Sequence, residues 1–121
     1  MYSITVQKHF DAAHFLREYL GKCGRLHGHR WLVQATYEND ELDQFGMVID
    51  FVDIKLALST IIEEQFDHFL INNFPPFNIL NPTAENIAKF FYDKLKSVLP
   101  THPKPKSVRI YESPDCYSEY R

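Results

Sequence analysis

The feature that most constrains this chain is a pair of histidines one residue apart, His27 and His29, in a stretch that alternates like a β-strand. Every second residue from Trp31 to Tyr37 is apolar and has the same parity as the two histidines. Side chains at i and i+2 of a strand point to the same face, so both imidazoles can reach one metal ion. Gly28 between them is expected to leave backbone room for that ion. The pattern predicts a half-buried strand with a metal site at its start.

A third histidine, His14, ends an apolar-flanked segment thirteen positions before His27. Three neutral imidazoles without a fourth protein ligand are typical of a catalytic zinc site that keeps one position open. Cys23 leaves two alternatives: it completes a closed structural zinc site, or it is a nucleophile or base beside an open, catalytic ion. The third reading, that these residues never meet, is the weakest, because two histidines one residue apart plus a remote histidine are uncommon by chance.

Periodicity along the chain predicts six elements. Residues 2–13 and 27–38 alternate like strands, and 66–82 are expected to be irregular. Asp50 and Thr83 are expected to be the N-caps of two amphipathic helices, the first ending near Gln65 and the second before Pro100. A third strand follows through 108–112 and a fourth through 116–120. The predicted class is α+β, a single domain over 1–121 with the order ββααββ: a four-stranded, largely antiparallel sheet with two helices on one face.

Composition limits the classes of function that this chain can have. The net charge of −3 gives no support for nucleic-acid binding, which requires a strongly basic face. The apolar runs are far shorter than the roughly 20 residues that a membrane span needs. The N-terminal residues lack the layout of a signal peptide, and the two cysteines form no disulfide pattern, so we expect a cytoplasmic protein with reduced thiols. The aromatic content of 15% indicates a well-filled core, an oligomer interface, or both.

Two carboxylates stand out. Asp67 beside His68 can fix the imidazole's tautomer and make it a general acid or base, although most such neighbours are solvated surface residues. Glu112 has the inward parity of its strand, and a buried carboxylate needs a partner. One partner would be a ligand with adjacent N–H donors, such as the edge of a pterin or guanine ring. The alternative is that Glu112 emerges into solvent at the strand end.

Basic residues surround the predicted metal motif. They could hold a polyphosphate through charge-assisted hydrogen bonds, and an ordinary charged rim is an equally good reading. These residues are Lys8, Lys22, Arg25 and Arg30.

Taken together, the chain resembles the family of 6-pyruvoyl- and 6-carboxy-tetrahydropterin synthases over essentially its whole length. The matching residues are Ala12-Ala13-His14, Cys23-Gly24-Arg25-Leu26-His27-Gly28-His29, Val48-Ile49-Asp50-Phe51, Asp67-His68-Phe69-Leu70-Ile71-Asn72, Pro82-Thr83-Ala84-Glu85 and Glu112. Three residues separate Cys23 from His27, which is similar to the bacterial 6-carboxy branch of queuosine and 7-deazaguanine synthesis. The pyruvoyl enzymes of biopterin synthesis usually carry two more residues there. Ile71 is a small departure, where leucine is commoner.

The resemblance implies a tunnelling fold, in which ββααββ subunits join edge to edge into a homo-oligomeric barrel, a hexamer or a tetramer. The implied reaction converts 7,8-dihydroneopterin triphosphate to 6-carboxy-5,6,7,8-tetrahydropterin, releasing triphosphate and acetaldehyde. The alternatives are a 6-pyruvoyl-tetrahydropterin synthase and a non-catalytic zinc-stabilised oligomer that binds a pterin or purine.

The resemblance also implies roles for individual residues. Zn²⁺ bound by the three histidines would bind and acidify the substrate's side-chain hydroxyls, and Cys23, as a thiolate, would be the general base. His68, oriented by Asp67, would move the complementary proton, and both residues are expected to serve a neighbouring subunit's zinc. The remaining expected substrate contacts are Glu112 to the pterin ring, helped by backbone groups of Thr83 and Ala84, and Lys22 and Arg25 to the phosphates.

Overall fold

The sheet is built from consecutive antiparallel neighbours. The computed structural model describes residues 1–121, and its sheet has the order β1-β2-β3-β4 with every pair antiparallel. The predicted order ββααββ is confirmed, and β1 and β2 each extend one residue beyond prediction. The elements are β1 (Tyr2–His14), the 3₁₀ turn η1 (Lys22–Gly24), β2 (His27–Asn39), α1 (Phe51–Gln65), the 3₁₀ turn η2 (Ile71–Asn73), α2 (Ala84–Val98), β3 (Ser107–Ser113) and β4 (Cys116–Tyr120).

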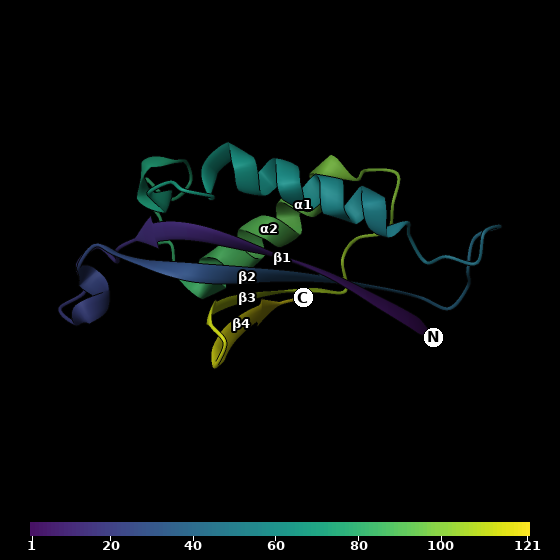
Figure 1. The fold of residues 1–121 in the computed structure, drawn as a ribbon, viewed down its shortest axis with the longest axis horizontal. Coiled ribbons are helices and arrows are strands. Elements are labelled where there is room, and N and C mark those ends of the chain that lie inside the picture. The colour runs from purple at the N-terminus through teal and green to yellow at the C-terminus, as the bar shows by residue number, and fades with distance from the viewer.

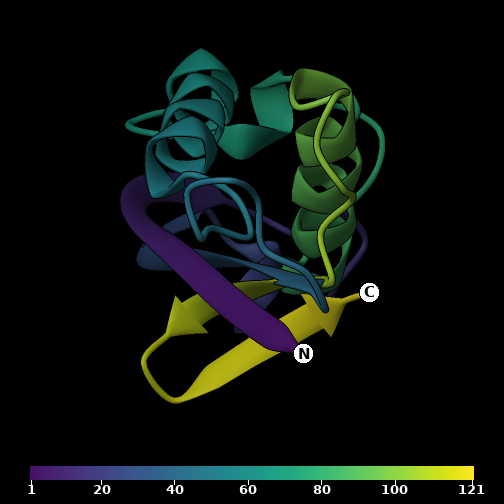
Figure 2. The same cartoon turned by 90° about the vertical axis from the view of Figure 1, so that its right-hand side faces the viewer.

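Both helices cover one face of the sheet, and the other face is open (Figures 1 and 2). The core lies between the two layers and takes alternate residues from the strands, as the period of two predicts. On β2 the inward side chains from Trp31 to Tyr37 are fully buried. His27 and His29 continue the same face beyond the aromatic core, at the end of the sheet where β1 finishes.

Side-chain caps fix where the two helices begin. The Asp50 carboxylate accepts the Val52 N–H at 2.9 Å, and the Thr83 hydroxyl accepts the Asn86 N–H at 3.1 Å. Each cap satisfies one of the backbone donors that a helix N-terminus leaves unpaired. Both caps are confirmed, and the second places the first turn of α2 beside the predicted site.

The irregular segment between the helices is bound to the chain that leaves β1. The Asn72 amide accepts the Phe15 N–H and donates to the Phe15 carbonyl, both at 3.0 Å. Asn81 does the same to Arg17, at 2.8 and 3.3 Å. The side chains of these two asparagines thus supply, beyond the end of β1, the kind of main-chain hydrogen bonds that a neighbouring strand would make. They hold the start of the β1–β2 loop, which carries Cys23.

None of the helices combines the length and the apolarity that crossing a bilayer would require.

Candidate metal and pterin site

Three histidines meet at one end of the sheet. In the β1–β2 register His14 lies opposite His27, and Ala12 lies opposite His29. One ring nitrogen from each histidine lies within 4.8 Å of the others, and the His14 and His27 Nε2 atoms are 3.0 Å apart. The cluster predicted from the histidine pattern is therefore present in the fold.

Backbone carbonyls fix which nitrogens face the centre of this cluster. The His14 Nδ1 lies 2.8 Å from the Pro82 carbonyl, and the His27 Nδ1 lies 2.6 Å from the Arg25 carbonyl. A carbonyl only accepts, so both Nδ1 atoms carry hydrogen and both Nε2 atoms present lone pairs. Two lone pairs at 3.0 Å repel unless a cation lies beside them. The His29 Nε2 is buried with no hydrogen-bond partner, so it is the third nitrogen available to a ligand here. This donor set fits a metal ion, with the backbone carbonyls orienting its ligands.

Burial favours the neutral form of His14 and His29. The pKa of His14 is lowered to about 4, mainly by loss of water and also by the neighbouring His27 and His29, against the opposing effect of the Pro82 carbonyl. Burial also lowers the pKa of His29, partly offset by the charge of Glu112. Neutral imidazole is the form that binds metal, so the site is ready to bind an ion at neutral pH.

Trp31 packs against the cluster and limits how its rings turn. Its indole meets the rings of His14 and His29 edge-on, with centroids 4.9 and 5.2 Å apart. The indole N–H donates to the Ala12 carbonyl at 3.1 Å, so the packing wall is itself held by a hydrogen bond. Trp31, the first core residue of β2, thus forms the floor of the site.

The role expected for Gly28 is wrong. A Cβ atom added there would meet only the Ala12 carbonyl oxygen, at 3.7 Å, which is an ordinary contact. Gly28 has the opposite parity to His27 and His29, so its side points to the open face of the sheet. The approach to the three imidazoles therefore does not depend on a glycine between them.

Cys23 lies in η1 and is exposed. Its thiol is not among the clustered ligand atoms, which are three nitrogens. Its carbonyl accepts the Leu16 N–H at 2.9 Å, which ties the middle of the loop to its start. The geometry therefore leaves a three-nitrogen site with the thiol outside it.

Asp67 and His68 form a pair on the edge of β1. The His68 Nδ1 lies 3.0 Å from the Asp67 carboxylate, whose other oxygen accepts the Asp11 N–H at 3.1 Å. That backbone donor is the main cause of a lowered pKa of Asp67. The His68 N–H donates to the Asp11 carbonyl at 2.6 Å, and this holds His68 at φ +63°, in the left-handed region.

The imidazole of His68 is not one of the three clustered histidines. It is 78% exposed, and its only ring partner is Asp67. The groove that it borders also includes Asp11, Ala13, Gly28 and His29, so one member of the cluster lines the same groove. The fold of one chain thus leaves His68 as an exposed ring beside this groove, outside the clustered ligand nitrogens.

Glu112 lies beside the histidines, at an irregularity in the β3–β4 pairing. Its pairing shifts between Tyr111 and Ser113, the kind of bulge that redirects a side chain. Its carboxylate lies 3.9 Å from the His14 Nε2 and is 31% exposed, so it is not a solvated strand end. The cavity that it borders is lined by Ala84, Glu85, Glu112, Cys116, Tyr117 and Ser118.

Two lining residues of this cavity were missed from the sequence. These residues are Glu85 and Cys116, neither of which was predicted to line the site. The Ser118 hydroxyl donates to Glu85 at 3.0 Å, which joins β4 to α2 across the cavity. The hairpin turn between β3 and β4 brings Cys116 back beside Glu112, and no local pattern reports that return.

The backbone contacts expected from Thr83 and Ala84 differ in availability. The Thr83 N–H already donates to the Asn81 carbonyl at 2.9 Å, and its hydroxyl caps α2. Ala84 is the first residue of α2, so its N–H has no partner within the helix, and it borders the cavity of Glu112. Ala84 is thus the better placed donor of the two.

The four basic residues separate into two groups. Lys8 contacts the Ser59 hydroxyl on α1, and Arg30 has the parity of the open face. Lys22 and Arg25, in contrast, are exposed on the Cys23 loop and form no ion pair. Lys22 and Arg25 are the cations left to meet an anionic ligand at this end of the molecule.

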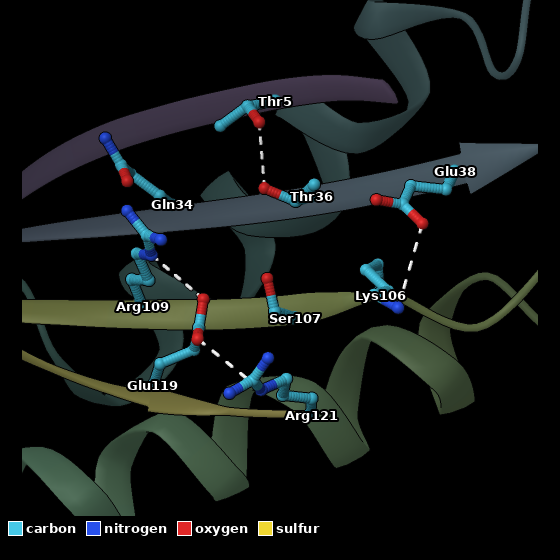
Figure 3. A pocket seen from close by; sticks show the side chains of 9 residues that line it. All are labelled: Thr5, Gln34, Thr36, Glu38, Lys106, Ser107, Arg109, Glu119 and Arg121. Atoms are coloured by element: carbon cyan, nitrogen blue, oxygen red, sulfur yellow. Dashed lines mark hydrogen bonds and ion pairs between the residues drawn. The ribbon is translucent and has the colours of Figure 1, made fainter. Parts of the chain in front are cut away.

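A separate polar cavity lies on the open face, away from the histidines (Figure 3). Its cations are largely paired within it: Glu119 lies 2.9 Å from Arg109 and 3.6 Å from Arg121, and Glu38 lies 3.8 Å from Lys106. No apolar side chain lines it. It has the character of a solvated sheet face cross-linked by ion pairs.

Known proteins are similar to this chain in sequence and in fold. Residues 3–121 match the family described as 6-pyruvoyl tetrahydropterin synthase. A Bacillus subtilis (strain 168) protein named 6-carboxy-5,6,7,8-tetrahydropterin synthase is 36% identical over 130 residues, covering 99% of this chain and 86% of its own length. A Synechocystis protein of the same name is 34% identical over 125 residues, covering 100% and 92%.

Structural comparison agrees with the sequence matches. The structure of Caenorhabditis elegans 6-pyruvoyl tetrahydropterin synthase superposes with a TM-score of 0.87 at 28% identity, covering 99% of this chain and 94% of that one. The match spans both the helices and the sheet, so it includes the three-histidine end. This chain belongs to the 6-pyruvoyl tetrahydropterin synthase family.

Proposed function

We propose that the chain is a zinc-dependent carbon–carbon lyase that converts 7,8-dihydroneopterin triphosphate to 6-carboxy-5,6,7,8-tetrahydropterin, with release of triphosphate and acetaldehyde. The observation that carries the proposal is the clustering of three imidazole nitrogens within 4.8 Å of one another, beside the Glu112 carboxylate. The loop before His27 adds an exposed thiol, Cys23. The relatives named 6-carboxy-5,6,7,8-tetrahydropterin synthase support this choice of product.

In this proposal His14, His27 and His29 hold the ion, which supplies Lewis acidity to the hydroxyls of the substrate's side chain. Glu112 accepts adjacent N–H groups of the pterin ring, and the Ala84 N–H donates to it. These contacts fix the ring so that the reacting side chain lies over the three imidazoles. Lys22 and Arg25 face the triphosphate, as exposed cations without an ion-pair partner.

Proton transfer is assigned to two groups. Cys23, as a thiolate, takes a proton from a side-chain carbon of the substrate. His68 handles the complementary proton, with its ring held by the Asp67 carboxylate at 3.0 Å. Cys23→Ala should therefore keep its zinc and its assembly while losing turnover. A loss of zinc in this variant would show that the thiol is a ligand and would refute its role as base.

The site is completed by a second copy of the chain. We propose a homo-oligomer in which His68 of one subunit serves the metal of its neighbour, since its ring is 78% exposed and has no partner in its own chain other than Asp67. β1 and β4 are the outer strands of the sheet. Residues 11–13 of β1 are bonded to the segment 67–70, so the rest of the β1 edge and the β4 edge are the parts that could pair with other subunits and close the sheets into a barrel. Hexamer and tetramer remain the two expected sizes.

The test is incubation of zinc-loaded protein with 7,8-dihydroneopterin triphosphate and identification of the products by mass spectrometry. A 6-carboxy-tetrahydropterin together with acetaldehyde supports the proposal. A 6-pyruvoyl product would place the chain in the other branch of the family. Unchanged substrate, with one zinc bound per chain, would show that the three-histidine site is structural or that the protein only binds its ligand.

The metal itself can be tested without turnover. A chelator should remove one ion per chain, and His27→Ala should lose that ion. We further propose that residues 1–121 act as one domain and that the enzyme works in the cytoplasm, where two free, exposed thiols stay reduced. The 6-carboxy product would feed queuosine or another 7-deazaguanine.

A further inference from the structure

The loop that carries Cys23 is closed by a main-chain contact at Gly24. A Cβ atom on Gly24 would lie 2.1 Å from the Tyr19 carbonyl oxygen and 3.5 Å from the Leu16 carbonyl oxygen. The first distance is more than 1 Å shorter than the roughly 3.5 Å at which nonbonded carbon atoms pack. The obstructing atom belongs to the backbone, so no side-chain rotation relieves the contact. Any other residue at position 24 forces the loop to move.

Both ends of this loop are held by hydrogen bonds, so the shift that a Cβ atom on Gly24 would cause falls on the residues between those ends. At the start, the main chain of Phe15 and Arg17 is bound by the amides of Asn72 and Asn81. At the end, His27 is paired with His14 in the sheet. The adjustment therefore falls on the middle of the loop, where Cys23 lies directly before Gly24 and where the bond from the Leu16 N–H to the Cys23 carbonyl would have to shift.

We propose that Gly24 is a positioning residue for the Cys23 thiol. The absence of a side chain at position 24 lets the loop fold tightly enough to place Cys23 beside the end of the sheet that carries the histidines. The inference rests on the proposed role of Cys23 as base, but its geometric part, that Gly24 sets the environment of the thiol, can be tested without turnover.

The chain offers a matched control in the same loop. A Cβ atom on Gly21 would also be too close to Tyr19, at 2.6 Å, but to the ring atom Cε1 rather than to the backbone. The Tyr19 side chain is 57% exposed and is free to turn away. Gly21→Ala and Gly24→Ala therefore make the same chemical change in one loop. Only the second places its Cβ atom against a main-chain atom, which no side-chain rotation can move away.

The experiment compares zinc-loaded wild type, Gly21→Ala and Gly24→Ala. Iodoacetamide alkylation of Cys23 is followed by peptide mass spectrometry between pH 6 and pH 9. Alkylation of Cys116, the second exposed cysteine, is the reference within each molecule. Zinc content, thermal unfolding and turnover of 7,8-dihydroneopterin triphosphate are measured on the same samples.

We expect Gly24→Ala to retain zinc and a cooperative unfolding transition. Its Cys23-to-Cys116 alkylation ratio, or the pH dependence of that ratio, should change by more than the difference between Gly21→Ala and wild type. Its kcat should fall on the order of 100-fold, the effect of displacing a reacting group by about 1 Å, while Gly21→Ala should keep a kcat close to that of wild type.

Other results separate the two proposals. Unchanged alkylation in Gly24→Ala would overturn the positioning role of Gly24, whatever the turnover. Changed alkylation with full turnover would overturn it as a catalytic device and would also refute Cys23 as the base. If wild type itself is inactive, the lyase proposal fails, and the alkylation comparison still decides whether Gly24 sets the environment of the thiol.

Discussion

At the scale of single residues, the chemistry depends on how three rings are turned. The carbonyls of Pro82 and Arg25 direct the Nε2 atoms of His14 and His27 inwards. The sequence shows that the histidines share a face, because parity is a local property. It does not show the carbonyls, since Pro82 lies far along the chain from His14. Ligand identity was therefore predictable here, and ligand orientation was not.

The low pKa of His14 predicts how the metal-free protein responds to acid. The pKa of His14 is about 4 in the folded state and 6.5 for an unperturbed histidine, so the unfolded chain binds more protons between these two pH values. The stability is complete above pH 6.5 and falls as the pH is lowered towards 4, by about 3 kcal/mol if His14 acts alone. Urea unfolding of the chelator-treated protein at several pH values measures this.

The control for that prediction is another histidine on the same strand. His9 is exposed, so His9→Gln should leave the loss of stability between pH 6.5 and 4 unchanged. His14→Gln should reduce the loss. An equal loss in His14→Gln and wild type would show that other groups cause it.

Tyr37 carries the one buried hydroxyl that has no partner. Its ring is fully buried, and burial raises the pKa of Tyr37 to about 12. An unpaired buried hydroxyl is destabilising, so Tyr37→Phe should raise the free energy of unfolding by about 1 kcal/mol. Chemical denaturation of the two proteins tests this. A clear loss of stability would show that the hydroxyl has a partner in the assembled protein.

At the scale of elements, the segment from Phe66 to Pro82 does more than connect two helices. It supplies the Asp67–His68 pair, the asparagine that binds the main chain of Phe15, and the carbonyl that orients His14. Its sequence predicted an irregular segment, which is correct, apart from the short turn η2. The contacts themselves join residues more than fifty positions apart, and hydrophobic periodicity carries no information about such bonds.

Removal of the Asn72 amide tests how much this segment supports the site. Asn72 is 4% exposed and makes two hydrogen bonds to Phe15, so Asn72→Ala leaves two backbone groups unpaired. We expect a loss of stability of about 2 to 3 kcal/mol. We also expect weaker zinc binding, because His14 adjoins Phe15. Denaturation and competition with a chromophoric chelator measure the two effects.

The adjacent asparagine is the control for this change. Asn73 is exposed and its side chain makes no hydrogen bond, so Asn73→Ala should change neither stability nor zinc affinity by a measurable amount. If Asn72→Ala destabilises the fold but binds zinc as wild type does, the coupling between this segment and the metal site is refuted.

At the scale of the whole molecule, the sheet was the most predictable part. Alternation defined the first three strands, the fourth was predicted as a segment that pairs back after a turn, and two side-chain caps defined the helix starts. The prediction was less successful where two segments meet. Gly28 was given a role that its parity excludes, and the Thr83 N–H, an expected substrate contact, already donates to the Asn81 carbonyl. In both cases the sequence shows the residue without the partner that the fold supplies.

The proposed role of His68 at a neighbouring subunit's metal predicts complementation between inactive variants. Cys23→Ala and His68→Ala should each be inactive, and unfolding and refolding them together should restore activity. Random assembly of equal amounts of the two variants leaves about a quarter of the inter-subunit sites intact. Specific activity of the refolded mixture, compared with wild type treated identically, measures this.

A second mixture is the control. Cys23→Ala and His27→Ala remove two parts that lie in the same chain, so refolding them together should restore nothing. Recovery in that mixture, or none in the first, would refute the assignment of His68 to a neighbouring site.

The pairing of His14 with His27 has one more consequence. These residues form the last rung of the ladder between the two longest strands, and the chain then departs into the Cys23 loop. An ion bound by both histidines would cross-link the two strands where that loop begins and ends. Such a cross-link fixes the register of the two strands, because a slip by a single residue would turn an imidazole to the other face of the sheet. Pairing of β1 with β2 and binding of the ion would then be thermodynamically coupled: the bound ion favours the correct register, and only the correct register binds the ion.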